Sequence, residues 1–330
     1  MKAPTMKAVV MKGYGSPDVL QVEEVAKPTP EANEVLIKIY ASTVTKADTM
    51  MRQANPFISR FFLGFTKPKN PMTGTGFAGV IEAVGESVTL FQRGDAVFGE
   101  TGVKFSANAE YVAIPEDGVV AKKPDTLSFE EAATMTDGPL TSLNFLKVLA
   151  EIQPGQKVLI NGASGSLGTA AVQLAKAFGA EVTGVCGPTN VELVESLGAD
   201  HVIDYSEVDF TKTGQTYDVI YDTVGKSSFS RAKGALTPNG VYLSPVLGLS
   251  LLLQMIKTAV VGGKKAKFSA TGLLPIPELR ELVNELKTIV AAGKLRTVID
   301  RRYSLAQTAE AHRYVDTGHK KGNVVIQIVN

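Results

Sequence analysis

Residues 157–178 read K-V-L-I-N-G-A-S-G-S-L-G-T-A-A-V-Q-L-A-K-A-F. The apolar run at 158–160 suits a buried parallel strand, and apolar residues recur at helical spacing over the second half of the segment. Between them, Gly162 permits a tight turn, Gly165 lets the backbone approach a pyrophosphate, and Gly168 allows close helix packing. Glycines alone also fit an ordinary structural turn, but with strand and helix in place they predict a dinucleotide-binding βαβ unit.

The turn and the start of the helix predict where the cofactor phosphates bind. Backbone N–H groups at a helix N-terminus carry partial positive charge, which favours negative phosphates there. The predicted cofactor-binding residues of this turn are Gly162, Ala163, Ser164, Gly165, Ser166, Leu167 and Gly168.

The end of the next apolar strand bears on which dinucleotide is bound. An NAD-selective site usually carries Asp or Glu there, about twenty residues beyond the glycines, for the ribose 2′-OH. Here E-V-T-G-V-C ends at Cys186 and G-P-T-N follows, so no carboxylate repels a 2′-phosphate. The sequence therefore favours NADPH, with NADH as the alternative. No Arg lies in this turn to pair with the phosphate, but Thr189, Asn190 and Tyr205 can donate hydrogen bonds to it. Alternatively, Thr189 and Asn190 only cap the next helix.

The composition is that of an ordinary globular protein. With 330 residues, 44% hydrophobic and 20% charged, the chain can form two domains. Its net charge of +1, from 34 basic and 33 acidic residues, predicts no nucleic-acid binding. The single cysteine excludes an intrachain disulfide and fits a reducing compartment. Because the N-terminus has no signal-peptide pattern, we expect a cytoplasmic protein.

One uncharged segment, from Gly240 to Ile256, tests for a membrane span. A span needs about twenty predominantly apolar residues, but Pro245 and Gly248 interrupt this run and Lys257 ends it. We therefore expect a buried strand, a turn and a helix, with no integral membrane span. Peripheral membrane contact stays open.

The pattern of predicted strands and helices differs between the first part of the chain and the rest. The first 120 residues carry short β-rich runs between Gly and Pro turns, typical of a compact β barrel. A mostly helical segment, 127–150, leads into alternating strands and helices, for which a right-handed doubly wound parallel sheet is the natural solution. Its five predicted strands lie at Val158, Val182, 201–203, 219–222 and 241–243.

Short strands return after a predicted helix at 277–292. We therefore predict a barrel-like β domain at 1–125, a dinucleotide-binding domain at 126–272, and a return to the first domain at 273–330.

Several longer sequence motifs identify a protein family more specifically than the glycines do. They are V-T-K-A-D-T at 44–49, G-T-G-F-A-G-V-I-E-A-V-G at 74–85, G-D-A-V-F-G at 94–99, A-E-Y-V at 109–112, S-L-G-A-D-H-V-I-D-Y at 196–205 and G-N-V-V-I at 322–326. With them the chain resembles, over nearly its whole length, the medium-chain dehydrogenase/reductase superfamily, and more narrowly its zinc-free quinone oxidoreductase branch, which includes zeta-crystallin-like enzymes. The resemblance implies an α/β fold: a GroES-like β-barrel catalytic domain plus a doubly wound parallel-sheet (Rossmann) domain.

The positions at which zinc-dependent relatives hold a catalytic metal carry threonines here. Those relatives have a Cys three residues before the Asp and a His in a Gly-His-Glu phrase, whereas this chain has Thr45 before Asp48 and Thr75 in G-T-G. Zinc requires thiolate or imidazole ligands, so we predict no metal site. The histidines all lie in the second half of the chain: His201, His312 and His319.

Without a Lewis acid, simple alcohol oxidation is harder. Hydride addition to a quinone or an activated alkene spreads the negative charge over a conjugated anion. The resemblance implies the same activity, a zinc-independent NADPH-dependent oxidoreductase of small-molecule quinones or α,β-unsaturated carbonyls. Two alternatives stay open: a zinc-independent NAD(P)-dependent alcohol dehydrogenase, and a dinucleotide-binding regulatory protein with little catalysis. The second is suggested by Thr45 and Met50, where the branch usually has Asn and Tyr.

The resemblance assigns further site residues. The catalytic candidates are Thr45, as a donor to the substrate oxygen, and Asp48, which alternatively only braces its loop. Thr141 is expected near the nicotinamide, or is a helix-start hydroxyl. The other predicted cofactor-binding residues are Val224, Gly225, Ser244, Pro245, Val246, Leu247, Lys321 and Asn323. An aromatic loop is expected to wall the substrate pocket or to pack in a core or dimer interface; it contains Phe57, Phe61, Phe62 and Phe65.

We also expect a homodimer. The last strand of the dinucleotide sheet, near Val241 to Leu251, is expected to expose unpaired backbone groups beside an apolar segment. Pairing across a twofold axis removes this hazard, although a covering loop or helix serves equally well.

Overall fold

The computed structural model describes residues 4–55, 57 and 60–328, with only the backbone of Phe62. The chain forms two compact units. Unit 1 comprises Met1–Asp137, Pro275–Lys287 and Ile299–Asn330, and unit 2 comprises Gly138–Leu274 and Thr288–Val298. Unit 1 thus extends past residue 125, where the sequence placed the first boundary.

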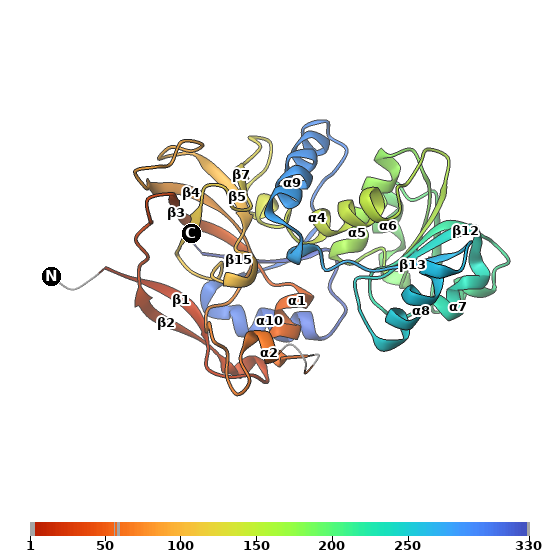
Figure 1. Cartoon of the computed structure of the whole chain (residues 1–330), viewed down its shortest axis with the longest axis horizontal. Coiled ribbons are helices and arrows are strands. Elements are labelled where there is room, and N and C mark those ends of the chain that lie inside the picture. The colour runs from red at the N-terminus through yellow and green to blue at the C-terminus, as the bar shows by residue number, and fades with distance from the viewer. Residues whose placement is uncertain (1–3, 56, 58–59, 329–330) are drawn as a thin grey trace. The chain divides into compact units, whose positions relative to one another are not determined.

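Unit 1 contains a seven-stranded sheet in the order β14-β15-β3-β4-β5-β7, with β6 also paired to β3, and a separate β1-β2 hairpin (Figure 1). The strands are β1 (Thr5–Met11), β2 (Leu20–Ala26), β3 (Glu34–Thr43), β4 (Gly76–Val84), β5 (Ala96–Glu100), β6 (Tyr111–Pro115), β7 (Val120–Lys122), β14 (Ile299–Ser304) and β15 (Asn323–Gln327). Most side chains of β3 are buried on both faces, and its backbone pairs with β4, β6 and β15. Its Ile37 and Ile39 pack with Phe77 in the core of the unit.

The helices of unit 1 lie around this sheet. They are α1 (Lys46–Gln53), α2 (Arg60–Leu63), α3 (Phe129–Ala133), α10 (Thr308–Asp316) and the first part of α9 (Ile276–Ala291). Helices α1 and α10 are neighbours although far apart in sequence (Figure 1). They therefore bring the predicted catalytic loop next to the C-terminal part of the chain.

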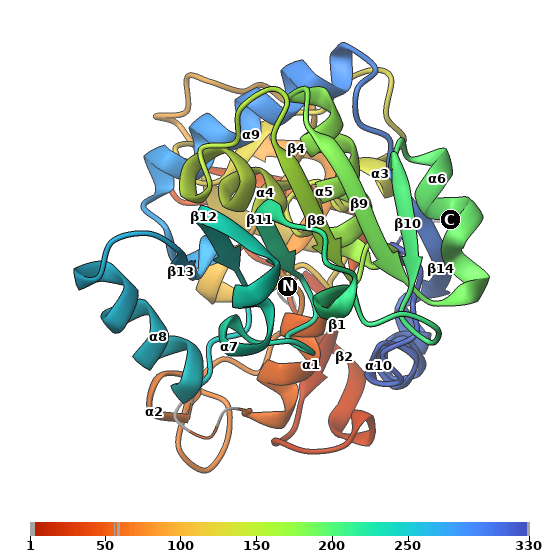
Figure 2. The same ribbon diagram turned by 90° about the vertical axis from the view of Figure 1, so that its right-hand side faces the viewer.

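Unit 2 is a parallel six-stranded sheet in the order β10-β9-β8-β11-β12-β13 (Figure 2). The strands are β8 (Lys157–Asn161), β9 (Glu181–Cys186), β10 (His201–Asp204), β11 (Tyr217–Asp222), β12 (Leu236–Leu243) and β13 (Lys265–Lys267). The five predicted strands are confirmed. The sixth, β13, was missed because K-A-K contains no apolar run. The strand order reverses between β8 and β11, where doubly wound sheets bind ligands at the carboxyl ends of their strands.

The helices of unit 2 are α4 (Gly138–Leu143), a π-helical turn (Asn144–Leu149), α5 (Ser166–Ala177), α6 (Val191–Ser196), α7 (Phe229–Ala232), α8 (Leu249–Val260) and the end of α9. The strand, turn and helix predicted for Gly240 to Ile256 are confirmed as the end of β12 and most of α8. Across the described part of the chain, no helix is both long and apolar enough to cross a membrane.

The prediction that the last strand of this sheet lies near Val241 to Leu251, with an unpaired edge, is wrong. Strand β12 pairs with β11 on one side and with β13 on the other. The edge is the short β13, whose Lys265 and Lys267 are the kind of charges that discourage edge-to-edge pairing.

Candidate functional site

Two glycines of the predicted phosphate turn are required by the local geometry. Gly162 has φ +81°, and a Cβ there would lie 2.7 Å from Thr223 Oγ1. A Cβ at Gly168 would lie 2.1 Å from the carbonyl oxygen of Gly162. Helix α5 therefore packs directly onto the turn, as the sequence indicated for Gly168.

Gly165 differs, because a Cβ would fit there. It is the N-cap of α5, with extended backbone, and the nearest described atom to a Cβ at this position is the Gly162 carbonyl oxygen, 3.6 Å away. The first turn of a helix has N–H groups without intrahelical acceptors. Because Gly165 has no side chain to cover these N–H groups, they can bind a pyrophosphate, as the dinucleotide hypothesis requires.

Asp222, at the carboxyl end of β11, organises the loops beside the turn. Its fully buried carboxylate accepts hydrogen bonds from Asn161 Nδ2 and the Tyr242 hydroxyl, both at 2.9 Å. It also accepts from the backbone N–H groups of Gly225, at 3.1 Å, and Ser227, at 2.8 Å. Burial and this carboxylate raise the pKa of Tyr242. The sequence analysis missed Asp222 as a site residue, although a carboxylate ending an apolar strand was a visible signal.

Two of the predicted cofactor loops meet. Gly225 has φ +66°, and a Cβ there would lie 2.9 Å from the Val246 Cβ. Ser244 is buried and its hydroxyl accepts a hydrogen bond from the Val246 N–H at 3.3 Å, while Val224, Val246 and Leu247 are exposed. The structure thus brings Val224–Gly225 and Ser244–Leu247 together after neighbouring strands.

The residues predicted to select the dinucleotide surround the end of β9. Asn190 is the N-cap of α6 but its side chain makes no capping bond; its Nδ2 donates to Ser164 Oγ of the glycine turn at 3.2 Å. Its buried Oδ1 has no partner among the described residues. Tyr205 is 63% exposed, and its hydroxyl would lie 3.1 Å from a Cβ at Gly187. Capping therefore does not account for Asn190. Burial raises the pKa of Cys186 to about 11, so this thiol is inert.

Thr141 is the fourth residue of α4, so it is not a helix-start hydroxyl. The helix packs closely on α5: Ser142 Oγ donates to the Leu167 carbonyl at 2.9 Å, and a Cβ at Gly138 would lie 2.5 Å from the Ser166 carbonyl oxygen. This packing places α4 beside the start of α5.

In unit 1, Thr45 and Asp48 form a reciprocal cap at the start of α1. The Thr45 hydroxyl donates to the Asp48 carboxylate at 2.6 Å, and the Thr45 N–H donates to the same oxygen at 2.8 Å. The Asp48 N–H donates to Thr45 Oγ1 at 3.1 Å. Asp48 therefore braces its loop, and the single hydroxyl hydrogen of Thr45 is engaged. Donation by Thr45 to a substrate stays a prediction and requires this bond to break.

Buried carboxyl groups lie near this cap. Burial, together with the nearby Asp137 carboxylate, raises the pKa of Asp48 to about 6 and that of Glu100 to about 7. Glu100 Oε1 is buried without a partner among the described residues. Neither Glu100 nor Asp137 was singled out from the sequence. No group of three or more His, Cys, Asp or Glu side chains within 4–55, 57 and 60–328 is arranged to hold a metal.

Glu100→Gln is expected to stabilise the protein at neutral pH. Because the folded-state pKa is raised from 4.5 to about 7, ionisation destabilises the folded state; the cost is absent below pH 4.5 and complete above about pH 7. The variant should therefore gain stability on the order of 2 kcal/mol near pH 8 and little at pH 4.5. Urea midpoints measured across this range check the prediction, and a difference independent of pH would contradict it.

A cavity of about 520 Å³ opens beside Asp48 in unit 1. It is lined by Met11, Asp48, Met51, Arg52, Phe61, Leu63, Pro68, Lys69, Asn70, Met72, Thr73, Gly74, Val103, Phe105 and His312. Of the aromatic loop, Phe57, Phe61 and Phe65 are all exposed, and Phe61 lines the rim of this cavity. The Phe62 side chain lies outside the described structure. The apolar, sulfur-rich lining suits a flat conjugated molecule.

His312 on α10 supplies a polar group to this cavity. It is 1% exposed, and neither ring nitrogen has a partner among the described residues. Burial, with the neighbouring Arg52, lowers its pKa to about 3, so the imidazole is neutral and can both donate and accept. The Arg52 guanidinium donates to the Gly15 carbonyl and to Asp316. The sequence analysis gave His312 no role in the site, because nothing local connects it with α1.

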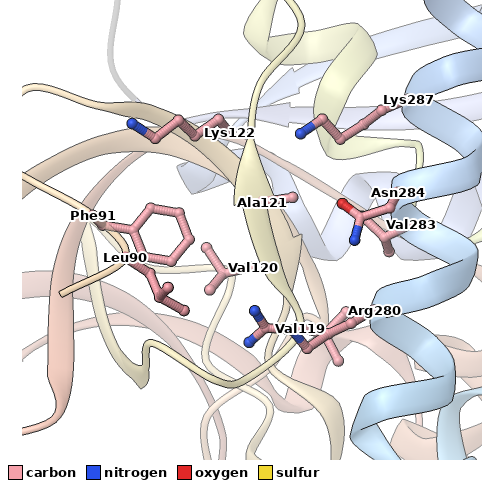
Figure 3. Close-up of a pocket in the computed structure, with 10 residues that line it drawn as sticks. All are labelled: Leu90, Phe91, Val119, Val120, Ala121, Lys122, Arg280, Val283, Asn284 and Lys287. Atoms are coloured by element: carbon pink, nitrogen blue, oxygen red, sulfur yellow. The ribbon is translucent and has the colours of Figure 1, made fainter. Parts of the chain in front are cut away.

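A second hollow of unit 1, about 180 Å³, contains none of the predicted site residues (Figure 3). Its cations include Lys122 and Arg280. Lys122 Nζ pairs with Asp95 at 2.9 Å, and the Arg280 guanidinium donates to the Glu116 carbonyl at 3.1 Å. We assign these two contacts a structural role.

Lys321 and Asn323 belong to unit 1. The Lys321 N–H donates to the Asp300 carboxylate at 2.8 Å, and Asn323 is the buried first residue of β15. The neighbouring Lys320 Nζ donates to the Gly322 carbonyl at 2.6 Å, and burial lowers its pKa. Their predicted place near the cofactor phosphates stays a prediction.

A GroES-like unit and a Rossmann-type parallel sheet with a phosphate turn define a dinucleotide-dependent oxidoreductase fold. Two family models match the sequence: an alcohol dehydrogenase GroES-like domain over residues 31–125 and a zinc-binding dehydrogenase domain over residues 197–326. The chain belongs to the medium-chain dehydrogenase/reductase superfamily and, within it, to the quinone-oxidoreductase-like proteins.

Individual relatives agree. The chain is 32% identical to a chloroplastic quinone-oxidoreductase homolog of Spinacia oleracea, over 99% of this chain and 100% of that one. It is also 32% identical to a 2-methylene-furan-3-one reductase of Solanum lycopersicum, over 97% of this chain and 79% of that one. Its fold matches the Escherichia coli quinone oxidoreductase complexed with NADPH with a TM-score of 0.84 and 26% identity, over 98% and 100% of the two chains.

Proposed function

We propose that this protein is a zinc-independent oxidoreductase that transfers hydride from NADPH to quinones or α,β-unsaturated carbonyls. The observation that carries the proposal is the glycine turn, in which Gly162 and Gly168 are sterically required while Gly165 leaves the start of α5 open. Relatives named for quinone and methylene-furanone reduction, and one crystallised with NADPH, support the same chemistry.

Each unit has its own part in the proposal. In unit 2 the N–H groups at the start of α5 hold the pyrophosphate, and Asp222 fixes the Val224–Gly225 loop beside them. When bound, NADPH supplies the hydride. In unit 1 the apolar cavity admits the acceptor, and neutral His312 offers it a hydrogen bond. Zinc independence is supported by Thr45 and Thr75, which have neither thiolate nor imidazole.

Steady-state oxidation of NADPH against a panel of quinones, enones and simple alcohols tests this function. We expect turnover of quinones or enones that survives chelation. Activity confined to alcohols and lost on chelation would reject the proposal, and tight NADPH binding without turnover of any acceptor would favour a regulatory protein. The proposal includes a cytoplasmic location and a homodimer; a 35.0 kDa species persisting at high concentration in sedimentation equilibrium would contradict the dimer.

Tyr205→Phe is expected to weaken NADPH binding more than NADH binding. Tyr205 is exposed beside Gly187, where the 2′-phosphate of NADPH is expected, and a lost hydrogen bond to a charged group costs about 1.5–3 kcal/mol. Titration of both cofactors measures this selectivity. Equal effects on both, or a wild-type preference for NADH, would remove Tyr205 from the 2′-phosphate site.

A further inference from the structure

Helix α8 exposes an apolar face. Leu251 and Thr258 face the core of unit 2, while the opposite side of the helix is exposed and apolar. The exposed side chains, with their exposed fractions, are Leu249 (74%), Leu252 (42%), Leu253 (57%), Ile256 (60%) and Val260 (86%). At 100° per residue these five positions form one stripe along the helix. Val246 and Leu247, before the helix, and Val261, after it, are also exposed. A contiguous apolar surface of this kind marks an interaction site.

The sequence around α8 carries charge of one sign. Between Asp222 and Glu278 there is no acidic residue, although the whole chain has almost equal numbers of acidic and basic residues. The cations of this stretch are Lys226, Arg231, Lys233, Lys257, Lys264, Lys265 and Lys267. Among them, the side chain of Arg231 pairs with Asp209. The stretch therefore keeps a clear excess of positive charge.

Unit 2 is polarised along its sheet. Strand β13 and α8 lie at one edge, whereas β10 and α6 lie at the other (Figure 2). The β9, α6 and β10 edge carries acidic residues: Glu181, Glu192, Glu195, Asp200 and Asp204. At the opposite edge, exposed Lys257 flanks the apolar stripe, and Lys265 Nζ donates to the Val261 carbonyl at 3.1 Å, near the end of α8. Positive charge thus borders the apolar face.

We propose that α8 docks this protein on the surface of an anionic lipid bilayer. The helix has 12 residues and spans about 18 Å, too short to cross the roughly 30 Å hydrocarbon core but suited to lie in the interface. Its leucines enter the boundary of the acyl chains, and the bordering lysines meet the anionic headgroups. Apolar quinones and enones partition into the same bilayer, so docking brings the enzyme to its acceptors.

Charge argues against a second copy of the chain as the occupant. A twofold contact through α8 brings two stretches together that have excess positive charge and no acidic residue between Asp222 and Glu278. Like charges across an interface are unfavourable, whereas an anionic surface complements them.

The chain has no tryptophan, so Leu253→Trp gives a single fluorophore on the apolar stripe. Leu90→Trp, at an exposed position of unit 1, is the matched control. We expect the emission of Leu253→Trp to shift to the blue and to be quenched by brominated lipid in vesicles of phosphatidylcholine with phosphatidylglycerol. The shift should be much smaller with phosphatidylcholine alone or at high salt. The Leu90→Trp emission should not change.

A second variant measures affinity without a probe. Leu253→Gln with Ile256→Gln keeps helix propensity and should lower partitioning onto anionic vesicles at least about tenfold, while NADPH oxidation with a water-soluble acceptor is unchanged. Lys257→Glu should reduce the preference for anionic lipid. The proposal is overturned if the emission of Leu253→Trp does not change when anionic vesicles are added. It is also overturned if the blue shift depends on protein concentration alone, because a second copy of the chain then covers the helix. Turnover of the water-soluble acceptor is scored separately, so failure of docking and failure of the proposed activity are distinguishable.

Discussion

Gly165→Asp is expected to abolish NADPH binding at ordinary cofactor concentrations, raising the dissociation constant roughly 100-fold or more while leaving the fold intact. A Cβ at this position meets no described atom closer than 3.6 Å, so a side chain can start there without a clash at its Cβ. Asp is also a better N-cap than Gly, so α5 should be at least as stable as before. The new carboxylate occupies the start of the helix, where two phosphates are proposed to bind, and repels them at close range.

Gly165→Asn is the matched control, because it has the same shape and capping ability without the charge. We expect an intermediate loss of affinity, from the side chain alone, and an unchanged melting temperature for both variants. Fluorescence titration of NADPH and a thermal melt separate the two effects. If Gly165→Asp binds NADPH as tightly as the wild type, the phosphates do not lie on this turn, and the proposed cofactor site loses its main support.

Local patterns explain what could be predicted from the sequence. The strand, the turn and helix α5 lie within residues 157–178, and the roles of Gly162 and Gly168 depend on neighbours in the same segment. The apolar strands β8 to β12 were visible for the same reason. Strand β13 was not, because its pairing with β12 is made by backbone groups while two of its three side chains are lysines.

Contacts between distant segments explain what could not be predicted. His312 reaches the cavity beside Asp48 only because α10 packs on α1. The hydrogen bond of the Thr45 hydroxyl depends on the rotamers of Thr45 and Asp48, which the sequence does not give. The T-x-x-D spacing allowed a cap, but the sequence alone did not decide whether Asp48 is catalytic or braces its loop. The Asp222 network joins three strands, so no single segment contains its partners.

Asp222→Leu is expected to destabilise unit 2 by about 4 kcal/mol or more and to release the Val224–Gly225 loop. The carboxylate accepts from four donors, namely Asn161 Nδ2, the Tyr242 hydroxyl, and the N–H groups of Gly225 and Ser227. Leucine leaves all four buried or part-buried donors without an acceptor, and unsatisfied buried donors cost about 1–3 kcal/mol each. Weaker NADPH binding should follow, because the loop is proposed to contact the cofactor.

Asp222→Asn tests whether the charge or the acceptor matters. Its one carbonyl oxygen can keep part of the network, while its amide donates where donors already point, so we expect a loss between those of the wild type and Asp222→Leu. Hydrogen exchange at the Gly225 and Ser227 amides measures how well the loop is held, and denaturant midpoints measure the stability of unit 2. If both amides stay protected in Asp222→Leu, other contacts hold the loop, and Asp222 is not the residue that positions it.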